Sequence, residues 1–334
     1  MTAPIRKSVA EAAALILLIL PAPSAAGQAA ASPDGARPAP AGFPAALDYE
    51  RFSFPPFREV PRLSEARRRK RVVVQSVTLT YRKKSGAEIP GWRVELYSPR
   101  TADPGSRLPL VVVMPFGGLG MDLSASFARR FAARGFLALE LERPPPEAEG
   151  AVLHSLTGTV KTLAEDTINL RRVIDWASRL PQADPARIGI LGVSRGAIVA
   201  ALAVQQDSKL RAVFVLGGAD LAGLYRRSHL HLVKKMRAKE TARAGGDPEK
   251  PASAAAAILG CVDPASRPGR IDPARTVLIN AKWDRVVPRA SALALREAAG
   301  GATQVWLPCG HYGTLLFARR IRRIALRHFE QTLR

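Results

Sequence analysis

The feature that most restricts the fold of this chain is the stretch RIGILGVSRGAIVAALAV, which begins at Arg187. Its first half is a short apolar run typical of a buried strand. Its second half, made of small and aliphatic residues, predicts a helix. At the junction, Ser194 stands between Gly192 and Gly196. A side chain at either glycine would collide with the neighbouring strand or helix, so the pattern predicts a crowded, sharp strand-to-helix turn with a serine at its apex.

Such a turn gives the serine a chemical use. A serine hydroxyl is a poor nucleophile until an adjacent base, an acid that orients the base, and donors for an oxyanion are supplied. The turn exposes the hydroxyl above the sheet and directs the N-terminus of the following helix towards developing negative charge. Ser194 is therefore a candidate nucleophile, and the alternative is a tight turn that contains an incidental serine.

The rest of the chain predicts a framework for this turn. Two strands of a hairpin, at 71–82 and 91–99, are followed by alternating strands and helices, which indicates an α/β fold with a mostly parallel, doubly wound sheet and helices on both faces. The run LPLVVVMP from Leu108 is apolar throughout, as expected of a strand buried on both faces. Further strands are expected at 136–142, 187–193, 210–218, 276–284 and 303–308, and helices at 124–135, 163–180, 196–204, 290–299 and 314–333.

Three segments fall outside this alternation. Residues 1–26 have the charges, short apolar run and small residues of a signal peptide, which predicts an exported protein, periplasmic or secreted; an uncleaved membrane anchor is the lesser alternative. Residues 27–71 are rich in Ala, Pro and Arg and are interpreted as a linker or strap. The α/β domain is expected at 72–334, with a basic, Ala-rich cap inserted at about 220–270.

Two residues that follow later strands are candidate partners for the serine. Asp284 comes just after the apolar strand in VLINAKWDRVVP, and His311 lies between the last strand and the last helix in WLPCGHYGTLLF. The carboxyl ends of parallel strands share one edge of a sheet, so these side chains are expected beside Ser194, in the chain order Ser, Asp, His. The remaining histidines fit less well: His229 and His231 are in the basic insertion, His328 is on the last helix, and His154 is left as a residue that lines a substrate site.

Backbone amides are the expected donors to an oxyanion. One is the amide of Arg195, directly after the serine, and the other is expected at Gly117, or at its neighbours Phe116 or Gly118, in the loop after the LVVVM strand. The side chain of Arg195 has two interpretations that stay open: an ion pair within the protein, or a contact to an anionic group of the substrate.

From about Val72 to Arg334 the sequence resembles the α/β-hydrolase superfamily, in particular its dienelactone-hydrolase-like and acyl-esterase-like branches. The resemblance rests on GVSRG, NAKWDRVVP, CGHYG and MPFGGLG. It implies Ser194 as nucleophile, His311 as general base and then acid, and Asp284 as the residue that orients His311. It also implies a small-molecule ester substrate and no metal or organic cofactor. Relatives usually carry His-Gly at the start of the oxyanion loop, where this chain has Pro115-Phe116.

The amino-acid composition does not identify a binding partner for this chain. The formal charge of +22 and the pI of about 11.1 attract anionic surfaces. Arginine spread along the chain by compositional bias is the preferred explanation of this charge. No helix-turn-helix, finger or aromatic platform is evident, so nucleic acid is not an expected partner. The two cysteines, Cys261 and Cys309, are too few for a four-ligand zinc site, and either a disulfide or two free thiols fits them.

The preferred functional hypothesis is a serine hydrolase that cleaves a carboxylic ester through an acyl-enzyme. A peptidase, a thioesterase and an acyltransferase on the same fold are the enzymatic alternatives. A non-catalytic basic protein that binds an anionic membrane or polymer weakly by charge is the alternative from another class.

Overall fold

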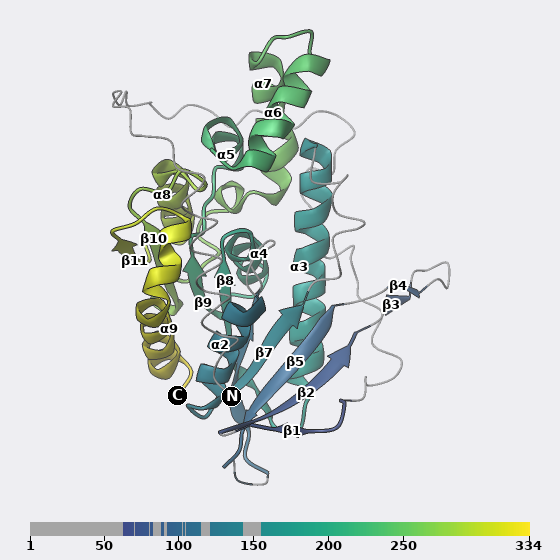
Figure 1. Cartoon of the computed structure of the whole chain (residues 1–334), viewed down its shortest axis with the longest axis vertical. Helices are drawn as coiled ribbons and strands as arrows, with labels where there is room; N and C mark the ends of the chain where they lie inside the picture. Colours follow the sequence, from purple (N-terminus) through teal and green to yellow (C-terminus); the bar gives the residue numbers. More distant parts are fainter. Residues whose placement is uncertain are drawn as a thin grey trace, which may run out of the picture. The chain divides into compact units, whose positions relative to one another are not determined.

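The computed structural model describes residues 63–69, 71–79, 81–82, 88–89, 92–101, 103, 105–114, 121–142 and 155–334 (Figure 1). All of them belong to the larger of the two units into which the chain divides, 39–334. The expected signal peptide, the expected strap up to residue 62, the residues expected to donate to an oxyanion from the Gly117 loop, and His154 lie outside these ranges.

A nine-stranded sheet forms the centre of the described chain, in the order β1-β2-β5-β7-β6-β8-β9-β10-β11. Neighbouring strands from β7 to β11 in this order run parallel, whereas β1, β2 and β5 pair antiparallel. This confirms the predicted α/β class. The strands are β1 (Arg67–Arg68), β2 (Val72–Thr78), β5 (Arg93–Pro99), β6 (Leu108–Val113), β7 (Leu137–Glu142), β8 (Ala183–Val193), β9 (Arg211–Val215), β10 (Thr276–Ala281) and β11 (Thr303–Leu307).

The early hairpin is more elaborate than expected. β2 and β5 pair as predicted, with Val77 opposite Val94. Between them, β3 (Tyr81–Arg82) and β4 (Glu88–Ile89) form a separate two-stranded sheet. The turn expected at Ser85-Gly86 lies outside the described residues. Arg67 and Arg68, from the segment expected to be a strap, form the edge strand β1 beside β2.

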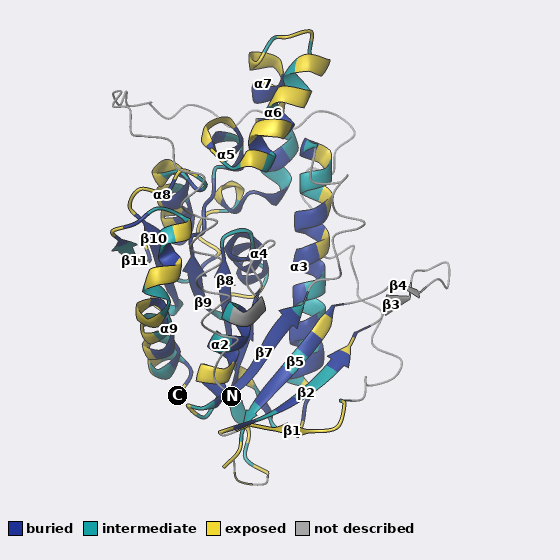
Figure 2. Ribbon diagram, viewed as in Figure 1, coloured by how far each residue is buried: buried dark blue, intermediate teal, exposed yellow. Residues whose placement is uncertain are grey.

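Helices cover both faces of the sheet because the central strands are apolar on both sides. In β6, Leu110 and Val112 belong to the core beneath α3, α4 and α8, whereas Val111 and Val113 belong to the core beneath α2 and α9. Figure 2 shows the central strands buried over most of their length. The helices are α2 (Met121–Ala132), α3 (Leu156–Ser178), α4 (Arg195–Val204), α8 (Arg289–Ala298) and α9 (Ala318–Thr332).

The starts of α3 and α9 differ most from the sequence expectation, and α2 begins three residues before its expected start. α3 begins at Leu156, seven residues before the expected start, because Ser155 caps it and accepts a hydrogen bond of 3.0 Å from the Gly158 amide. The last helix begins later than expected. Its first residues form the 3₁₀ segment η6 (Tyr312–Phe317), and α9 starts at Ala318.

The insertion expected at about 220–270 contains the helices α5 (Leu221–Arg227), α6 (His231–Arg243) and α7 (Glu249–Leu259), followed by the short turns η3 (Gly260–Val262) and η4 (Pro264–Ser266). These helices lie at the top of Figure 1, beyond the carboxyl end of β9. The Asp263 carboxylate joins the two ends of the insertion, because it accepts hydrogen bonds from the amides of Asp220 (3.1 Å) and Leu221 (2.6 Å). None of the helices in the described ranges has the length and hydropathy that crossing a bilayer requires.

Candidate active site

Ser194 occupies a strained turn between β8 and α4. Its backbone has φ 55° and ψ −120°, a conformation that is costly for a residue with a side chain. The sheet holds this conformation in place, since the Ser194 amide donates a 2.8 Å hydrogen bond to the carbonyl of Val215 in β9. A Cβ atom at Gly192 would lie 2.3 Å from the carbonyl oxygen of Gly196, so any side chain at this position would collide with the turn, as expected.

The three side chains singled out in the sequence meet in one chain of hydrogen bonds. Ser194 Oγ lies 3.2 Å from Nε2 of His311. On the other side of the imidazole ring, Nδ1 lies 2.7 Å from Oδ2 of Asp284. A proton on Nδ1, donated to the carboxylate, leaves Nε2 free to accept the serine proton. The geometry is that of a nucleophile, a base and an orienting acid.

Asp284 is positioned by its own loop. Its second carboxylate oxygen, Oδ1, accepts hydrogen bonds from the amides of Val286 (2.8 Å) and Val287 (2.9 Å). The Asp284 side chain is 1% exposed and the His311 side chain 11% exposed. Two backbone donors and the imidazole therefore hold the carboxylate in one orientation away from water, which fixes the ring of His311 in turn.

The topology explains why residues so distant in sequence meet. Ser194 follows β8, Asp284 follows β10 and His311 follows β11, and these strands are parallel members of one sheet. Each residue therefore lies just past the carboxyl end of its strand, at the edge of the sheet where α/β proteins bind ligands.

The first expected oxyanion donor, the amide of Arg195, lies at the N-terminus of α4. Arg195 is the first residue of α4, and the amides of a helix's first turn have no acceptor within the helix. The partial positive charge at the helix N-terminus adds to this amide. The second donor, expected at Gly117, stays a prediction, because that loop lies outside the described residues.

Of the two interpretations of the Arg195 side chain, the structure shows the ion pair within the protein. Its Nη2 lies 2.5 Å from Oδ2 of Asp166 in α3. Asp166 is buried, 5% exposed, and sequence reasoning missed it. Its spacing was the available signal: it comes three residues after Leu163 and four before Leu170, so it shares their buried helix face. The pair ties α3 to the turn that carries the serine.

The two cysteines are free thiols in the structure. Cys261 Sγ donates to the carbonyl of Ile258 at 3.2 Å. Burial raises the pKa of both thiols, and the nearby Asp284 carboxylate also raises the pKa of Cys309. Neither thiol is therefore activated as a nucleophile. Within the described residues, no three His, Cys, Asp or Glu side chains gather in a way that could hold a metal ion.

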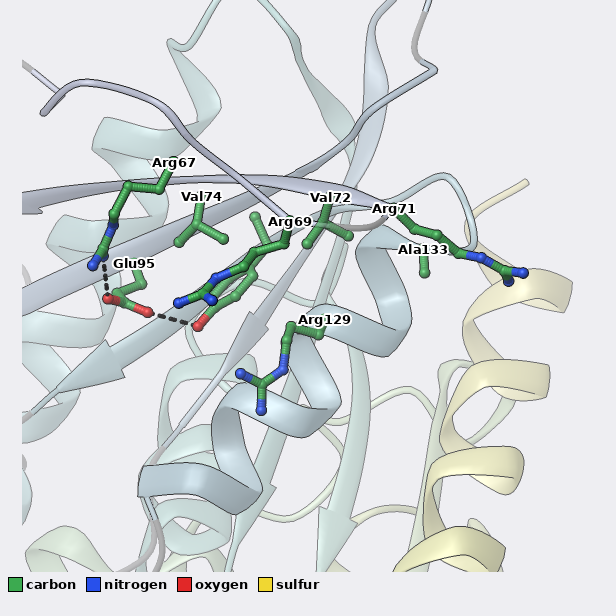
Figure 3. Close-up of a pocket in the computed structure, with 9 residues that line it drawn as sticks. Arg67, Arg69, Arg71, Val72, Val74, Glu95, Arg129 and Ala133 are labelled. Carbon is green, nitrogen blue, oxygen red and sulfur yellow. Dashed lines mark hydrogen bonds and ion pairs between the residues drawn. The ribbon is translucent and has the colours of Figure 1, made fainter. Parts of the chain in front are cut away.

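A second polar cluster lies away from Ser194, at the antiparallel edge of the sheet. A pocket of about 550 Å³ is lined by Arg67, Arg69, Arg71, Val72, Val74, Glu95, Tyr97, Arg129 and Ala133. Figure 3 shows Arg67 reaching Glu95, a 3.0 Å ion pair, while Arg129 enters from helix α2.

At the wall of this pocket, two carboxyl groups share the hydroxyl of Tyr97. Tyr97 Oη lies 2.6 Å from Glu95 Oε2 and 2.9 Å from Glu140 Oε2. Burial is the main cause that raises the pKa of Glu140 to about 7, and the hydrogen bond from Tyr97 lowers it only in part. Because a hydroxyl has one proton to donate, a protonated Glu140 can donate to Tyr97 while Tyr97 donates to Glu95.

Comparisons with known proteins find similar chains. No protein-family model matches this chain. The uncharacterised protein YcjY of Escherichia coli is 24% identical over 138 residues, 41% of this chain and 44% of that protein. The uncharacterised protein PA2218 of Pseudomonas aeruginosa is 31% identical over 123 residues, 36% of this chain and 31% of that protein. The matched segments thus span less than half the length of either curated relative.

Solved structures match far more of the chain. The crystal structure of PA2218 covers 81% of this chain and 99% of its own, with a TM-score of 0.52 and 16% identity. An acetyl xylan esterase from Paenibacillus sp. R4 covers 79% and 86%, with a TM-score of 0.54 and 17% identity. The AtxE2 isopeptidase covers 82% of this chain and 48% of its own, with a TM-score of 0.55 and 17% identity. Together with the parallel sheet and its strand-to-helix serine turn, these matches show that the chain has the fold of the α/β-hydrolase superfamily.

Proposed function

We propose that this chain is a serine hydrolase that cleaves carboxylic esters through an acyl-enzyme. The observation that carries the proposal is the continuous hydrogen-bond chain from Ser194 through His311 to Asp284, with links of 3.2 and 2.7 Å. The fold supports it, and an acetyl xylan esterase is among the proteins of similar structure.

In the first half of the reaction, Ser194 Oγ attacks the ester carbonyl carbon and its proton passes to Nε2 of His311. The carbonyl oxygen becomes an oxyanion, for which the Arg195 amide and an amide of the Gly117 loop are the proposed donors. When the tetrahedral intermediate collapses, the bond to the alcohol oxygen breaks and the alcohol leaves with the proton from His311. The acyl group remains on Ser194.

In the second half, water replaces the alcohol. The water oxygen attacks the acyl carbon while His311 accepts a proton from the water. His311 then returns that proton to Ser194 Oγ as the acid leaves. Asp284 keeps Nδ1 protonated and steadies the imidazolium in both halves. These steps require no metal or organic cofactor.

The peptidase and thioesterase alternatives differ from an esterase in the bond that is cleaved, so a substrate panel separates them. Purified protein is assayed on p-nitrophenyl esters of increasing acyl length, on peptides and on acyl thioesters, beside Ser194→Ala. We expect ester hydrolysis to exceed the other activities and to fall by on the order of 10³-fold or more in the variant. Preferred hydrolysis of peptides or thioesters reassigns the substrate, and undiminished ester hydrolysis by Ser194→Ala refutes the mechanism.

We also propose that the protein is exported, on the basis of the signal-peptide pattern in residues 1–26. The test is the N-terminal sequence of the protein recovered from an expressing bacterium. A mature chain that begins near residue 27 in the periplasm or medium supports export with cleavage. An intact N-terminus in the cytoplasmic fraction contradicts it.

A further inference from the structure

Exposed apolar side chains gather at one place on the described surface. Five large apolar residues of the described chain are well exposed, and four of them lie on the loops after β10 and β11. These four are Trp283 (61% exposed), Tyr312 (47%), Leu315 (44%) and Leu316 (88%). The fifth, Leu293, is on α8, which packs on the opposite face of the sheet from α9. Such a concentration is unusual on a protein surface unless it is covered in use.

These two loops are the ones that carry Asp284 and His311. The Trp283 amide donates a 3.0 Å hydrogen bond to the carbonyl of Cys309, which joins the loops side by side. The Tyr312 ring packs edge-on against the ring of His311, with centroids 5.4 Å apart. Trp283 and Tyr312 therefore border the candidate active site directly, and Leu315 and Leu316 follow Tyr312 in η6. We call these four residues the apolar rim.

Positive charge surrounds the apolar rim. Segments 282–289 and 311–323 contain seven Lys and Arg residues and a single acidic residue, Asp284. Asp284 is buried against His311, so it does not offset the surface charge. Lys282, Arg285, Arg319 and Arg320 are exposed within these segments. The rim thus combines aromatic and leucine side chains with a basic border.

We propose that the apolar rim and its basic border dock onto the surface of an anionic lipid bilayer. Trp and Tyr favour the interface between headgroups and acyl chains, exposed leucines gain free energy by entering the acyl region, and Lys and Arg are attracted to anionic headgroups. A second copy of this chain fits less well, because an isologous contact would bring two basic borders together. Nucleic acid would leave the leucines without an apolar partner.

The consequence for catalysis rests on the proposed function. Docking through these loops places His311 and Asp284 next to the bilayer surface, so ester substrates that partition into the membrane reach Ser194 without crossing bulk water. The inference therefore deepens the proposed activity by naming membrane-partitioned esters as its substrate class. Docking itself is independent of catalysis and is measured with an inactive variant.

The test is sedimentation of Ser194→Ala protein with phosphatidylcholine vesicles that contain or lack phosphatidylglycerol. We expect binding only to the anionic vesicles, and weaker binding as salt rises. Adding Leu316→Glu should weaken binding about tenfold or more, since an apolar contact is lost and a negative charge gained. Leu293→Glu makes the same chemical change outside the rim and should bind within about twofold of the parent. Arg319→Gln should weaken binding roughly fivefold.

Several outcomes overturn the proposal. It is refuted if Leu316→Glu and Leu293→Glu bind equally well, because the attraction is then that of a basic protein in general. It is also refuted if vesicles do not bind and sedimentation velocity shows dimers that Leu316→Glu dissociates, which would make the rim an interface between copies. If vesicles bind as expected but wild-type protein hydrolyses no ester, the docking surface stands and the proposed function fails. Circular dichroism confirms that each variant folds.

Discussion

The two polar clusters of this molecule use buried carboxyl groups in opposite ways. Beyond the parallel strands, Asp284 meets three dedicated donors: the amides of Val286 and Val287 and the Nδ1 of His311. Near the antiparallel edge, the one hydrogen bond that the Glu140 carboxyl group makes within the described residues is with the shared hydroxyl of Tyr97, and burial raises its pKa to about 7.

The difference shows that a buried carboxyl group needs hydrogen-bond donors of its own in order to stay ionised and orient another side chain. With its own donors, a carboxylate is held in one place and can orient a third group. Without them, desolvation favours the neutral acid, and the group binds a proton close to neutral pH. We therefore expect Asp284 to matter for turnover and Glu140 to matter for the pH dependence of stability.

The largest expected effect comes from Asp284→Asn, which leaves the shape of the site but removes the acceptor that orients His311. We expect kcat for ester hydrolysis to fall by on the order of 10³- to 10⁴-fold, by analogy with other triads, with little change in KM. Steady-state kinetics on a short p-nitrophenyl ester measure it. A loss of less than about tenfold would mean that Asp284 does not orient the base.

A smaller effect is expected from the ion pair between the serine turn and α3. Asp166→Asn leaves the mostly buried Arg195 guanidinium without its carboxylate, which should lower the free energy of unfolding by about 3 kcal/mol. Asp175→Asn is the matched control on the same helix, because its pair with Arg179 is exposed and should contribute less than about 1 kcal/mol. Urea denaturation measures both, and equal losses would remove any special role for Asp166.

The smallest effect concerns Glu140. Its folded pKa of about 7 lies above its ordinary value of 4.5, so the folded protein holds this proton more tightly than the unfolded chain. The stabilisation is complete below about pH 4.5 and is lost as pH rises through about 7. Glu140→Gln should therefore be more stable than wild type above pH 7, by on the order of 2 kcal/mol, and lose that advantage in acid.

Thermal unfolding across this pH range measures the effect. Glu142→Gln, on the same strand but with a more exposed side chain, is the matched control for removing a carboxyl group from β7. A stability difference between Glu140→Gln and wild type that does not vary with pH would contradict a proton held by Glu140.

Local pattern was sufficient to predict most elements of this fold. The apolar run at Leu108 and the glycine-flanked Ser194 specify a buried strand and a crowded turn because sterics and burial act within a few residues. The order of the strands in the sheet, by contrast, could not be predicted from local pattern. β7 lies between β5 and β6 in the sheet, and this depends on how crossover connections pack rather than on any single strand.

The same distinction holds for the candidate site. Ser194, Asp284 and His311 were found because each follows a strand, and the fold alone then places strand ends together. Asp166 and the amides of Val286 and Val287 were not found, since their roles come from contacts between elements. The sequence analysis placed Glu140 in the strand FLALELE without assigning it a role. Sequence alone does not reveal that a glutamate in an apolar strand faces inwards against a tyrosine.

The central claim is that His311 and Asp284 make the hydroxyl of Ser194 reactive, and covalent labelling tests it most directly. Wild-type protein, Ser194→Ala and His311→Ala are treated with a fluorophosphonate and analysed by intact-mass and peptide mass spectrometry. We predict one adduct on Ser194 in the wild type, none in Ser194→Ala, and labelling slowed by on the order of 10³-fold in His311→Ala. Equal labelling of Ser194→Ala, or an unlabelled Ser194 in protein that hydrolyses esters, would contradict the account.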